Sequence, residues 1–551
     1  MQLLATSRAT TLTVLAAALA LLAALAPSVA VADEGHHVSH HVVEGAQGTD
    51  IAITVHRPAG ASADRPVPVI LHSHGWGGSR TSSDGAFRRE LERGFAVVSI
   101  DQRGFGESGG QSHVQDPDLE GRDIIAVIDR VAEFDWVLRD TDDEGRPIAD
   151  DPVLFAMGGS YGGGFQLVTA LTEIAERGET RFNALAPDMT WFDLSRSLAP
   201  EGVVRTAWAT LLYAVGIPTI APHIHESFVF GATTGQWPDG TVPGTTDLDE
   251  RFFRNGPAGF VDQGIQLDIP ALITQGFSDN LFNGNEGWHN FERTLTDEAR
   301  AQSLFVGYNG GHALPNVLPP GWAAGGDACV EDAGELRLAF FEAVLTGEDP
   351  GALRDAPYSV TTADGDCLEV TSLAPTTAVE VEDLLVEGRT LFTTGVGAVQ
   401  HHELLTGPAT VAGVPTLHAE VTSVGVDQRA FFALSAGTSP LDARVVQNNM
   451  MPLRELEPVV EEPRSIELPA IAVEVDEGES LFLTVSPISD MSFGHGSIRT
   501  PGAVLLGDVN VDLPLLRDDE DDAVTCPPAR RPDHAQGRVP DLCAPPGHQG
   551  R

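Results

Sequence analysis

The spacing of hydrophobic residues follows two different patterns, which divide the chain into two stretches. In the first, which ends near residue 352, short apolar runs alternate with longer segments whose apolar residues recur every three or four positions. The short runs predict strands and the longer segments predict amphipathic helices. Because the two kinds alternate, they predict a parallel sheet covered by helices on both faces. The clearest strands are Phe95 to Ile100 and then the runs VLFAM, FNALAP, ALITQG and SLFVGY.

Three helices belong to this first stretch. Apolar residues from Ile124 to Ala132 fall on one helical face, Phe165 to Ala175 forms a second helix, and Glu335 to Leu345 forms a third. At the start, the β-branched runs 40–58 and 66–78 are separated by polar turn residues. We expect these two runs to pair as a hairpin that leads into the sheet.

The alternation breaks between Asp188 and Asp268. Residues 190–216, TWFDLSRSLAPEGVVRTAWATLLYAVG, have the period of a helix rather than that of a strand. We therefore expect a helical cap at about residues 188–268, inserted into a first domain of residues 33–352.

From about Pro357 the apolar residues alternate with polar ones at period two. The runs TLHAEVTSV, RAFFALSA and SLFLTVSP are separated by Gly and Pro, and long helical patterns are scarce. This pattern predicts a β-sandwich over residues 353–517. Residues 518–551 begin with the acidic run DDEDD and are then rich in Pro, Arg and Gly, which predicts little order apart from two cysteines.

The first 32 residues have the pattern of a secretory signal peptide. Arg8 precedes a nearly unbroken apolar run from Leu12 to Ala26, and small residues follow before the first acidic residue. The run is shorter than the roughly 20 residues that span a bilayer, which favours a cleaved signal over a membrane anchor. We expect cleavage after Ala32, and hence a secreted protein without a membrane span.

Four cysteines remain in a chain that is expected to reach an oxidising compartment. Disulfides are therefore expected, and the shortest closures pair Cys329 with Cys367 and Cys526 with Cys543. Two other connectivities are possible. Metal-bound thiols are disfavoured because no pair has the close spacing of a zinc site.

The charge is strongly acidic and has consequences for binding. The formal net charge is −46, and all 33 positive residues are arginines. This composition disfavours a nucleic acid partner, since binding a phosphate backbone requires clustered positive charge. GC-rich coding explains the absence of lysine but not the acidic excess, and we interpret that excess as adaptation to salty surroundings.

The motif with the clearest chemistry is GGSYG, from Gly158 to Gly162. It fits G-x-S-x-G and lies between a predicted strand and a predicted helix. On such a tight turn the hydroxyl of Ser160 projects from the carboxyl edge of the sheet. The free amides at the start of the helix are then available to an oxyanion. A turn that merely joins a strand to a helix is the alternative interpretation.

A serine nucleophile needs a base that is oriented by an acid, in the chain order Ser, acid, His. Asp279 follows the strand ALITQG, and His312 follows the strand SLFVGY, so both are expected at the same sheet edge as Ser160. The interval between Ser160 and Asp279 leaves room for a cap, and the interval between Asp279 and His312 leaves room for one helix. The alternatives to the acid are Asp262 and Asp268, which precede the strand, and Glu286, seven residues further on.

The oxyanion hole requires two amides. We expect them to be the backbone amides of Tyr161 and of Trp76, in the segment HSHGWGG, where Gly75 permits a tight turn. Trp76 could instead form a pocket wall or belong to the core. Asp101 and Arg103 are expected to fix a turn. The histidines of GHHVSHH, residues 35–41, could bind a metal, but no carboxylate or cysteine pattern accompanies them.

These features resemble a known family. The elbow GGSYGGG, the turn DQRGFGESGG, Asp279, His312 and the β-rich segment LLTGPATVAGVPTLHAEVTS are similar to the Xaa-Pro dipeptidyl-peptidase and cocaine-esterase group of α/β hydrolases. The resemblance covers roughly residues 45–515. It implies an α/β-hydrolase domain with a helical cap, an all-β jelly-roll (galactose-binding-like) domain, and a triad of Ser160, Asp279 and His312. Trp76 stands where the esterase branch has an oxyanion-binding tyrosine, so the resemblance does not choose between ester and peptide.

The sequence therefore predicts a secreted serine hydrolase that works through an acyl-enzyme without a cofactor or metal. Its substrate is either a peptide, cleaved as by an Xaa-Pro dipeptidyl-peptidase, or a small acyl ester. The alternative from another class is a catalytically inactive hydrolase-like protein whose jelly-roll domain attaches it to extracellular polymer.

The acidic composition generates a first prediction. Salt shortens the Debye length from about 30 Å at 0.01 M to about 3 Å at 1 M, which screens repulsion among surface carboxylates. We expect the melting temperature to rise as sodium chloride is increased over that range, as measured by differential scanning calorimetry. A melting temperature that stayed constant or fell would contradict salt adaptation.

Overall fold

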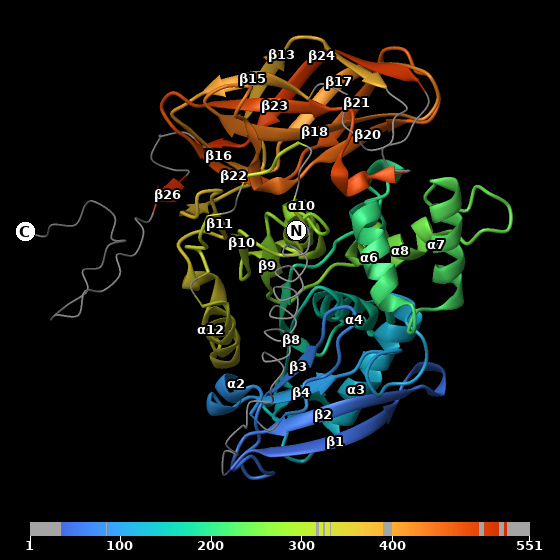
Figure 1. Cartoon of the computed structure of the whole chain (residues 1–551). Coiled ribbons are helices and arrows are strands. Elements are labelled where there is room, and N and C mark those ends of the chain that lie inside the picture. Colours follow the sequence, from blue (N-terminus) through green and yellow to red (C-terminus); the bar gives the residue numbers. More distant parts are fainter. Residues whose placement is uncertain are drawn as a thin grey trace, which may run out of the picture.

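The structure is a computed structural model and describes residues 35–83, 85–315, 319–322, 325–330, 332–388, 399–494, 501–516 and 523–525. An α/β part carries an antiparallel β domain on one side, and a group of helices lies beside both (Figure 1). The predicted fold class, an α/β-hydrolase sheet followed by a C-terminal antiparallel β domain, is confirmed.

The α/β part is built on a single sheet, to which eleven strands contribute among the described residues. Its middle, from β4 to β11, is parallel throughout, and both edges are antiparallel. In spatial order the strands are β1 (His37–Glu44), β2 (Asp50–Arg57), β4 (Ala96–Ile100), β3 (Val69–Ser73), β7 (Leu154–Gly159), β8 (Phe182–Asp188), β9 (Leu272–Gly276), β10 (Leu304–Tyr308), β11 (Tyr358–Thr361), β12 (Cys367–Val370) and β26 (Ala523–Thr525).

Helices cover both faces of this sheet because its strands are apolar on both sides. Leu71 and its neighbours on one face pack against α3 (Arg122–Ala132) and α4 (Tyr161–Arg177). Ile70 and its neighbours on the other face pack against α12 (Ala333–Thr346). Shorter elements of this part are α2 (Arg88–Glu92), η2 (Pro117–Gly121), β5 (Arg139–Thr141), β6 (Pro147–Pro152), α10 (Gly284–His289), η4 (Asn290–Thr294) and α11 (Asp297–Arg300).

Helices also occupy the segment between β8 and β9, where the sequence predicts a cap. They are α5 (Leu194–Leu198), α6 (Thr206–Gly216), α7 (Pro222–Thr234), α8 (Leu248–Arg254) and α9 (Pro257–Asp262). The longest, α7, starts with a proline at its first position and ends before Gly235, whose φ of 75° is the left-handed cap that favours glycine. The cap helices lie to one side of the sheet (Figure 1).

Among its described residues, the antiparallel β domain has two five-stranded sheets that share one hydrophobic core, together with a small third sheet. One sheet contains β13 (Thr377–Val381), β14 (Leu384–Gly388), β17 (Thr416–Val424), β21 (Glu462–Glu467) and β24 (Gly502–Leu513). The other contains β15 (Gln400–Thr406), β18 (Gln428–Gly437), β19 (Arg444–Val445), β20 (Met451–Glu455) and β23 (Ser480–Ser486). The third contains β16 (Ala409–Gly413), β22 (Ile471–Val475) and β25 (Leu515–Leu516).

One strand of this domain departs from the expected alternation. All residues of β18 are buried, because Phe432 faces the domain core while Phe431 packs against Val203 of the cap. A strand covered on both faces has a continuous apolar run. The β domain therefore packs directly on the cap.

Three details near the edges of the sheet differ from the expectations. The first β-branched run folds back on itself as the hairpin β1–β2, with its turn at Ala46–Gly48, while the second run becomes β3 between β4 and β7. The predicted pairing of the two runs is therefore wrong. Past residue 352, β11 and β12 continue the sheet of the α/β part, and β26 joins its edge from within the segment expected to have little order.

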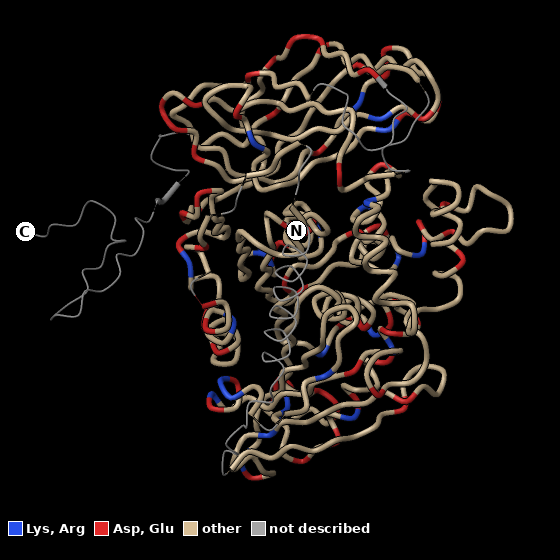
Figure 2. Tube along the Cα trace, in the orientation of Figure 1, with Lys and Arg blue, Asp and Glu red and all other residues tan. Residues whose placement is uncertain are grey.

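Acidic residues mark the outer turns of both parts, whereas arginines are fewer (Figure 2). Several arginines are used inside the fold rather than on its surface. Arg103 donates to both carboxylate oxygens of Asp123 at 2.7 Å, and Arg181 donates to Glu173 at 2.7 Å, all four side chains being buried. The acidic excess is thus concentrated at the surface, where salt screens it.

Cys329 forms a disulfide with Cys367, as the sequence predicts. Cys526 and Cys543 lie outside the described residues, as does the predicted signal peptide. Within the described part of the chain, no helix is long and apolar enough to cross a membrane.

The disulfide ties the segment before α12 to β12 across a sequence separation of 38 residues. Closing a loop of this size stabilises a fold by about 2–4 kcal/mol, mainly by restricting the unfolded chain. We expect the free energy of unfolding of the double variant Cys329→Ala, Cys367→Ala to be lower by that amount. Its midpoint of unfolding in guanidinium should fall accordingly. An unchanged midpoint at an unchanged slope would contradict it.

Candidate active site

Ser160 occupies the turn between β7 and α4 in a backbone conformation that is rare for residues other than glycine. Its φ is 58° and its ψ is −120°. The neighbouring glycines make this turn possible, because a Cβ at Gly158 would lie 2.5 Å from the Gly162 carbonyl oxygen, and one at Gly162 would lie 2.5 Å from the Ser73 carbonyl oxygen. The motif therefore forms a sharp elbow that exposes Ser160 at the carboxyl edge of the sheet.

His312 and Asp279 meet Ser160 at this edge. Nε2 of His312 lies 2.9 Å from Oγ of Ser160, and Nδ1 of His312 lies 2.6 Å from Oδ2 of Asp279. With the ring proton on Nδ1, the histidine donates to the carboxylate and accepts from the serine hydroxyl. The structure thus brings together the three residues that the sequence singled out.

Asp279 is fully buried and its two oxygens accept four hydrogen bonds. Oδ1 accepts from the amides of Leu281 and Phe282, at 2.9 and 2.8 Å, and Oδ2 accepts from the amide and the ring of His312. Gly311 has φ of 90°, and a Cβ there would lie 2.5 Å from Oδ2. Glycine at this position therefore allows the histidine to approach the carboxylate closely.

A buried cation from the cap also contacts this region. Arg205 donates to the carbonyl oxygens of Asn280 and Leu281, the two residues that follow Asp279 in its loop. Burial lowers the pKa of Arg205 to about 10, so the side chain remains positive at neutral pH. The negative charges of Glu286 and Asp279 oppose this lowering and favour the charged form of Arg205.

The alternative acids have other positions. Oε2 of Glu286 accepts from the amides of Phe192 and Asp193, both at 2.9 Å, and so helps to anchor the start of the cap. Asp262 ends α9 and Asp268 precedes β9, at the opposite end of the strand from Asp279. The carboxylate that reaches His312 belongs to Asp279.

The two residues expected to supply the oxyanion hole belong to segments that lie next to Ser160. Tyr161 is the first residue of α4, and Gly75 lies so close that a Cβ there would be 3.9 Å from the Ser160 Cβ. No described residue accepts a hydrogen bond from the Trp76 or the Tyr161 amide. The Trp76 indole donates to the Leu212 carbonyl oxygen at 2.9 Å, so its ring nitrogen is already used and only its backbone amide remains for an oxyanion.

The side chain of Tyr161, which the sequence leaves without a role, belongs to the core. Its hydroxyl lies 2.9 Å from Oγ of Ser112, and burial raises the pKa of the phenol, so the hydroxyl stays neutral. As expected, Asp101 and Arg103 hold turns. Asp101 accepts from the Glu107 amide at 2.8 Å, and Arg103 binds Asp123.

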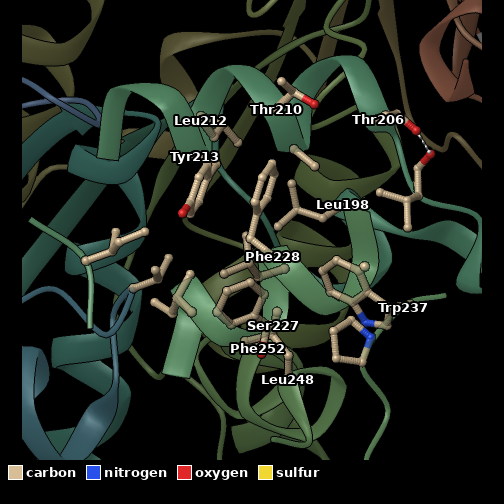
Figure 3. Close-up of a pocket in the computed structure, with 18 of the residues that line it drawn as sticks. Leu198, Thr206, Thr210, Leu212, Tyr213, Ser227, Phe228, Trp237, Leu248 and Phe252 are labelled. Atoms are coloured by element: carbon tan, nitrogen blue, oxygen red, sulfur yellow. Dashed lines mark hydrogen bonds between the residues drawn. The ribbon is translucent and has the colours of Figure 1, made fainter. Parts of the chain in front are cut away.

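Ser160 is one of the residues that line a cavity among the cap helices, whose empty volume is about 1190 Å³ with open solvent included. Figure 3 shows part of its lining. Its walls come mainly from α5, α6, α7 and α8, and the rings of Tyr213 and Phe228 stack within them at a centroid distance of 3.6 Å. None of the described residues that line it is Asp, Glu, Lys, Arg or His.

Among the aromatic lining residues, the tryptophan and tyrosine side chains use their polar atoms in hydrogen bonds within the protein. The indoles of Trp76, Trp191 and Trp237 donate to the Leu212 carbonyl, the Asn255 carbonyl and the Asp249 carboxylate. The hydroxyls of Tyr161 and Tyr213 pair with Ser112 and His225. The cavity therefore meets mostly hydrocarbon surface, with a few side-chain hydroxyls such as those of Thr210 and Ser227. The sequence analysis named Trp76 as a possible pocket wall, and it does line the cavity. It missed the other lining residues, since an aromatic residue in the sequence gives no sign of which cavity it lines.

No group of three His, Cys, Asp or Glu side chains in the described part of the chain is arranged to hold a metal ion. In the predicted N-terminal histidine cluster, His40 lies 3.0 Å from the Thr54 hydroxyl and His41 lies 2.9 Å from the Ser39 hydroxyl. These histidines belong to the edge strand β1.

The elbow, the parallel sheet and the serine, histidine and aspartate contacts define an α/β hydrolase. Residues 47–225 match the model of the X-Pro dipeptidyl-peptidase family (S15 family), in agreement with the resemblance that the sequence indicates. No curated protein matches the sequence.

Solved structures show the same fold over most of the chain. A CocE/NonD family hydrolase from Staphylococcus aureus is 14% identical, with a TM-score of 0.58, over 87% of this chain and 94% of its own. An aminopeptidase from the marine sediment archaeon Thaumarchaeota archaeon is 12% identical, with a TM-score of 0.60, over 90% and 98%. An α-amino acid ester hydrolase is 11% identical, with a TM-score of 0.54, over 89% and 98%.

The geometry predicts different effects for substitutions at Asp279 and at Glu286, the alternative acid. We expect Asp279→Asn to lower kcat by about 10⁴-fold, because an amide replaces one acceptor oxygen by a donor NH₂ group and imposes the wrong histidine tautomer. Glu286→Gln serves as the matched control, and we expect it to retain most of its activity, since an amide oxygen can still accept from the cap amides. Steady-state kinetics checks both. Equal losses in the two variants would contradict the assignment of the acid.

Proposed function

We propose that the protein is a secreted serine esterase that hydrolyses esters of large apolar acyl groups through an acyl-enzyme. The observation that carries this proposal is the position of Ser160, which contacts His312 and also lines an uncharged cavity. A nucleophile at the end of an apolar cavity favours substrates whose acyl part is itself apolar.

In the proposed reaction, Oγ of Ser160 attacks the ester carbonyl carbon while Nε2 of His312 takes the hydroxyl proton. The amides of Tyr161 and Trp76 stabilise the oxyanion of the tetrahedral intermediate. His312 then gives its proton to the leaving alkoxide, and the acyl-enzyme remains. A water molecule repeats these steps, which releases the carboxylic acid and restores Ser160. Asp279 keeps the ring oriented and stabilises its protonated form.

The cavity favours an ester over an Xaa-Pro peptide. A dipeptidyl-peptidase must bind the charged amino terminus of its substrate, and removing an ammonium group from water without a partner is strongly unfavourable. The described lining residues supply no carboxylate for that purpose. We assign the cavity to the acyl group because Trp76 and Tyr161, whose amides would meet the carbonyl oxygen, contribute to its walls.

Two further observations bear on the rival hypothesis and on localisation. In an inactive binding protein there is no selection for the contacts among Ser160, His312 and Asp279, and their hydrogen-bond distances therefore favour an enzyme. The disulfide between Cys329 and Cys367 supports export, since disulfides persist in oxidising compartments.

A substrate comparison tests the proposal. We expect covalent labelling of the wild type by a fluorophosphonate, with no labelling of Ser160→Ala. We also expect higher kcat/KM for nitrophenyl octanoate than for nitrophenyl acetate, and negligible hydrolysis of Gly-Pro-nitroanilide. Faster hydrolysis of the nitroanilide would make the protein a peptidase, and labelling no greater than in Ser160→Ala would support the inactive binding protein.

The role of the cavity has its own test. Ala209 of α6 lines the cavity, whereas Leu211 of the same helix is exposed and does not. We expect Ala209→Trp to lower kcat/KM for the octanoate by roughly tenfold or more, about 1.4 kcal/mol or more, with little change for the acetate. Leu211→Trp is the matched control and should change neither. If Ala209→Trp lowered both esters equally, the cavity would not hold the acyl group.

A further inference from the structure

We infer that the antiparallel β domain positions the active site through three consecutive residues, Gln447, Asn448 and Asn449. These residues, which we call the amide clasp, bind the two loops that carry Asp279 and His312. The inference rests on the proposed function, because it concerns the geometry of the same reacting groups. It gives the β domain a role in turnover, although the three residues lie more than 130 positions along the chain from the loops that they bind.

Asn449 binds the loop of the acid. Its side-chain Nδ2 donates to the carbonyl oxygens of Phe277 and Asp279, both at 2.9 Å. Asn449 is buried, so these hydrogen bonds do not compete with water. The peptide unit of Asp279 is therefore held by a residue 170 positions away along the chain.

The other two residues bind the histidine loop on either side of His312. Nδ2 of Asn448 donates to the Leu314 carbonyl oxygen at 2.7 Å, and Nε2 of Gln447 donates to Oδ1 of Asn309 at 3.1 Å. Both residues are buried. Asn309 follows β10 directly, so the clasp fixes the histidine loop where it leaves the sheet and again after the histidine.

The two loops are also joined to each other, which makes them a single unit for the clasp to hold. The Asn280 amide donates to the His312 carbonyl oxygen at 3.2 Å. The Asn280 side chain donates to the Leu314 carbonyl oxygen at 2.6 Å and accepts from the Leu314 amide at 3.1 Å. Asn449 therefore acts at one side of this unit and Asn448 at the other.

The clasp adopts an unfavourable backbone conformation. Gln447 has φ of 47° and Asn448 has φ of 63°, in the left-handed region that favours glycine. Such strain persists where the surroundings determine the conformation, and it concentrates at functional sites. Here the strained turn aims three successive side-chain amides at the α/β part. A turn needed only to connect β19 with β20 has no reason to be strained in this way.

The physical consequence concerns geometry rather than substrate binding. None of the three clasp residues lines the substrate cavity, so their loss should leave KM nearly unchanged. A displacement of about 1 Å in a reacting group can lower the rate by about 10²-fold. The clasp residues are therefore positioning residues that act through Asp279 and His312.

The test compares Asn449→Ala, Asn449→Ser and Asn448→Ala with Asn510→Ala, all in the full chain. Asn510 is a matched control, because its side chain donates only to the Asp508 carbonyl oxygen within the β domain, at 3.1 Å, among the described residues. Each kcat is measured with nitrophenyl octanoate per site titrated by a fluorophosphonate, well below each melting temperature.

We expect Asn449→Ala to lower kcat per titrated site by roughly 10- to 100-fold, with KM within about twofold of the wild type. Asn449→Ser, which has nearly the volume of alanine but keeps one donor, should recover part of that loss. Asn448→Ala should have a smaller effect, since Asn280 also donates to Leu314. If Asn449→Ala does not fold, the other two variants carry the same test.

Values of kcat for all the clasp variants equal to that of Asn510→Ala would overturn the inference, as would equal losses in Asn449→Ser and Asn449→Ala. Failure of the proposed function has a different signature. In that case the wild type is labelled no more than Ser160→Ala, and neither protein hydrolyses the ester.

Discussion

The buried carboxylate of Asp279 is the constraint on which the arrangement of both domains depends. A charged group without access to water must be fully hydrogen-bonded, or its ionised form is lost. Asp279 meets this requirement with two amides of its own loop and with the amide and ring of His312. The geometry that satisfies the carboxylate is thus the same geometry that aims the histidine at Ser160.

This requirement explains why residues distant in sequence converge on one short loop. Arg205 of the cap and Asn449 of the β domain both donate to carbonyl oxygens next to the carboxylate. Buried carbonyl oxygens require a donor, and these two side chains supply it. Cap, sheet and β domain therefore meet at Asp279, and none of them is merely attached to the others.

Local chemistry explains which parts of this arrangement could be predicted from sequence. The elbow at Ser160 needs small residues at fixed offsets, and Asp279 and His312 each follow a recognisable strand, so these features are visible in the chain itself. The run 40–58 forms a hairpin by itself instead of pairing with the run 66–78. The sequence does not reveal this, because the turn GAQG lies inside a single run of strand-forming residues. The amide clasp depends on contacts between residues more than 130 positions apart, and nothing in VVQNNM marks a turn that binds another domain. The cavity depends on how the cap helices pack, which the sequence does not show either.

The contrast between an acidic surface and an uncharged cavity has a bearing on turnover. A neutral ester can enter the cavity without losing the hydration of a charge, and the apolar walls then favour it. Hydrolysis converts that ester into a carboxylate, and no described lining residue carries a positive charge to hold the product. The product is therefore disfavoured where the substrate was favoured, and a molecule with a net charge of −46 repels it further. In the proposed reaction the same charge distribution that admits the ester promotes the release of the acid.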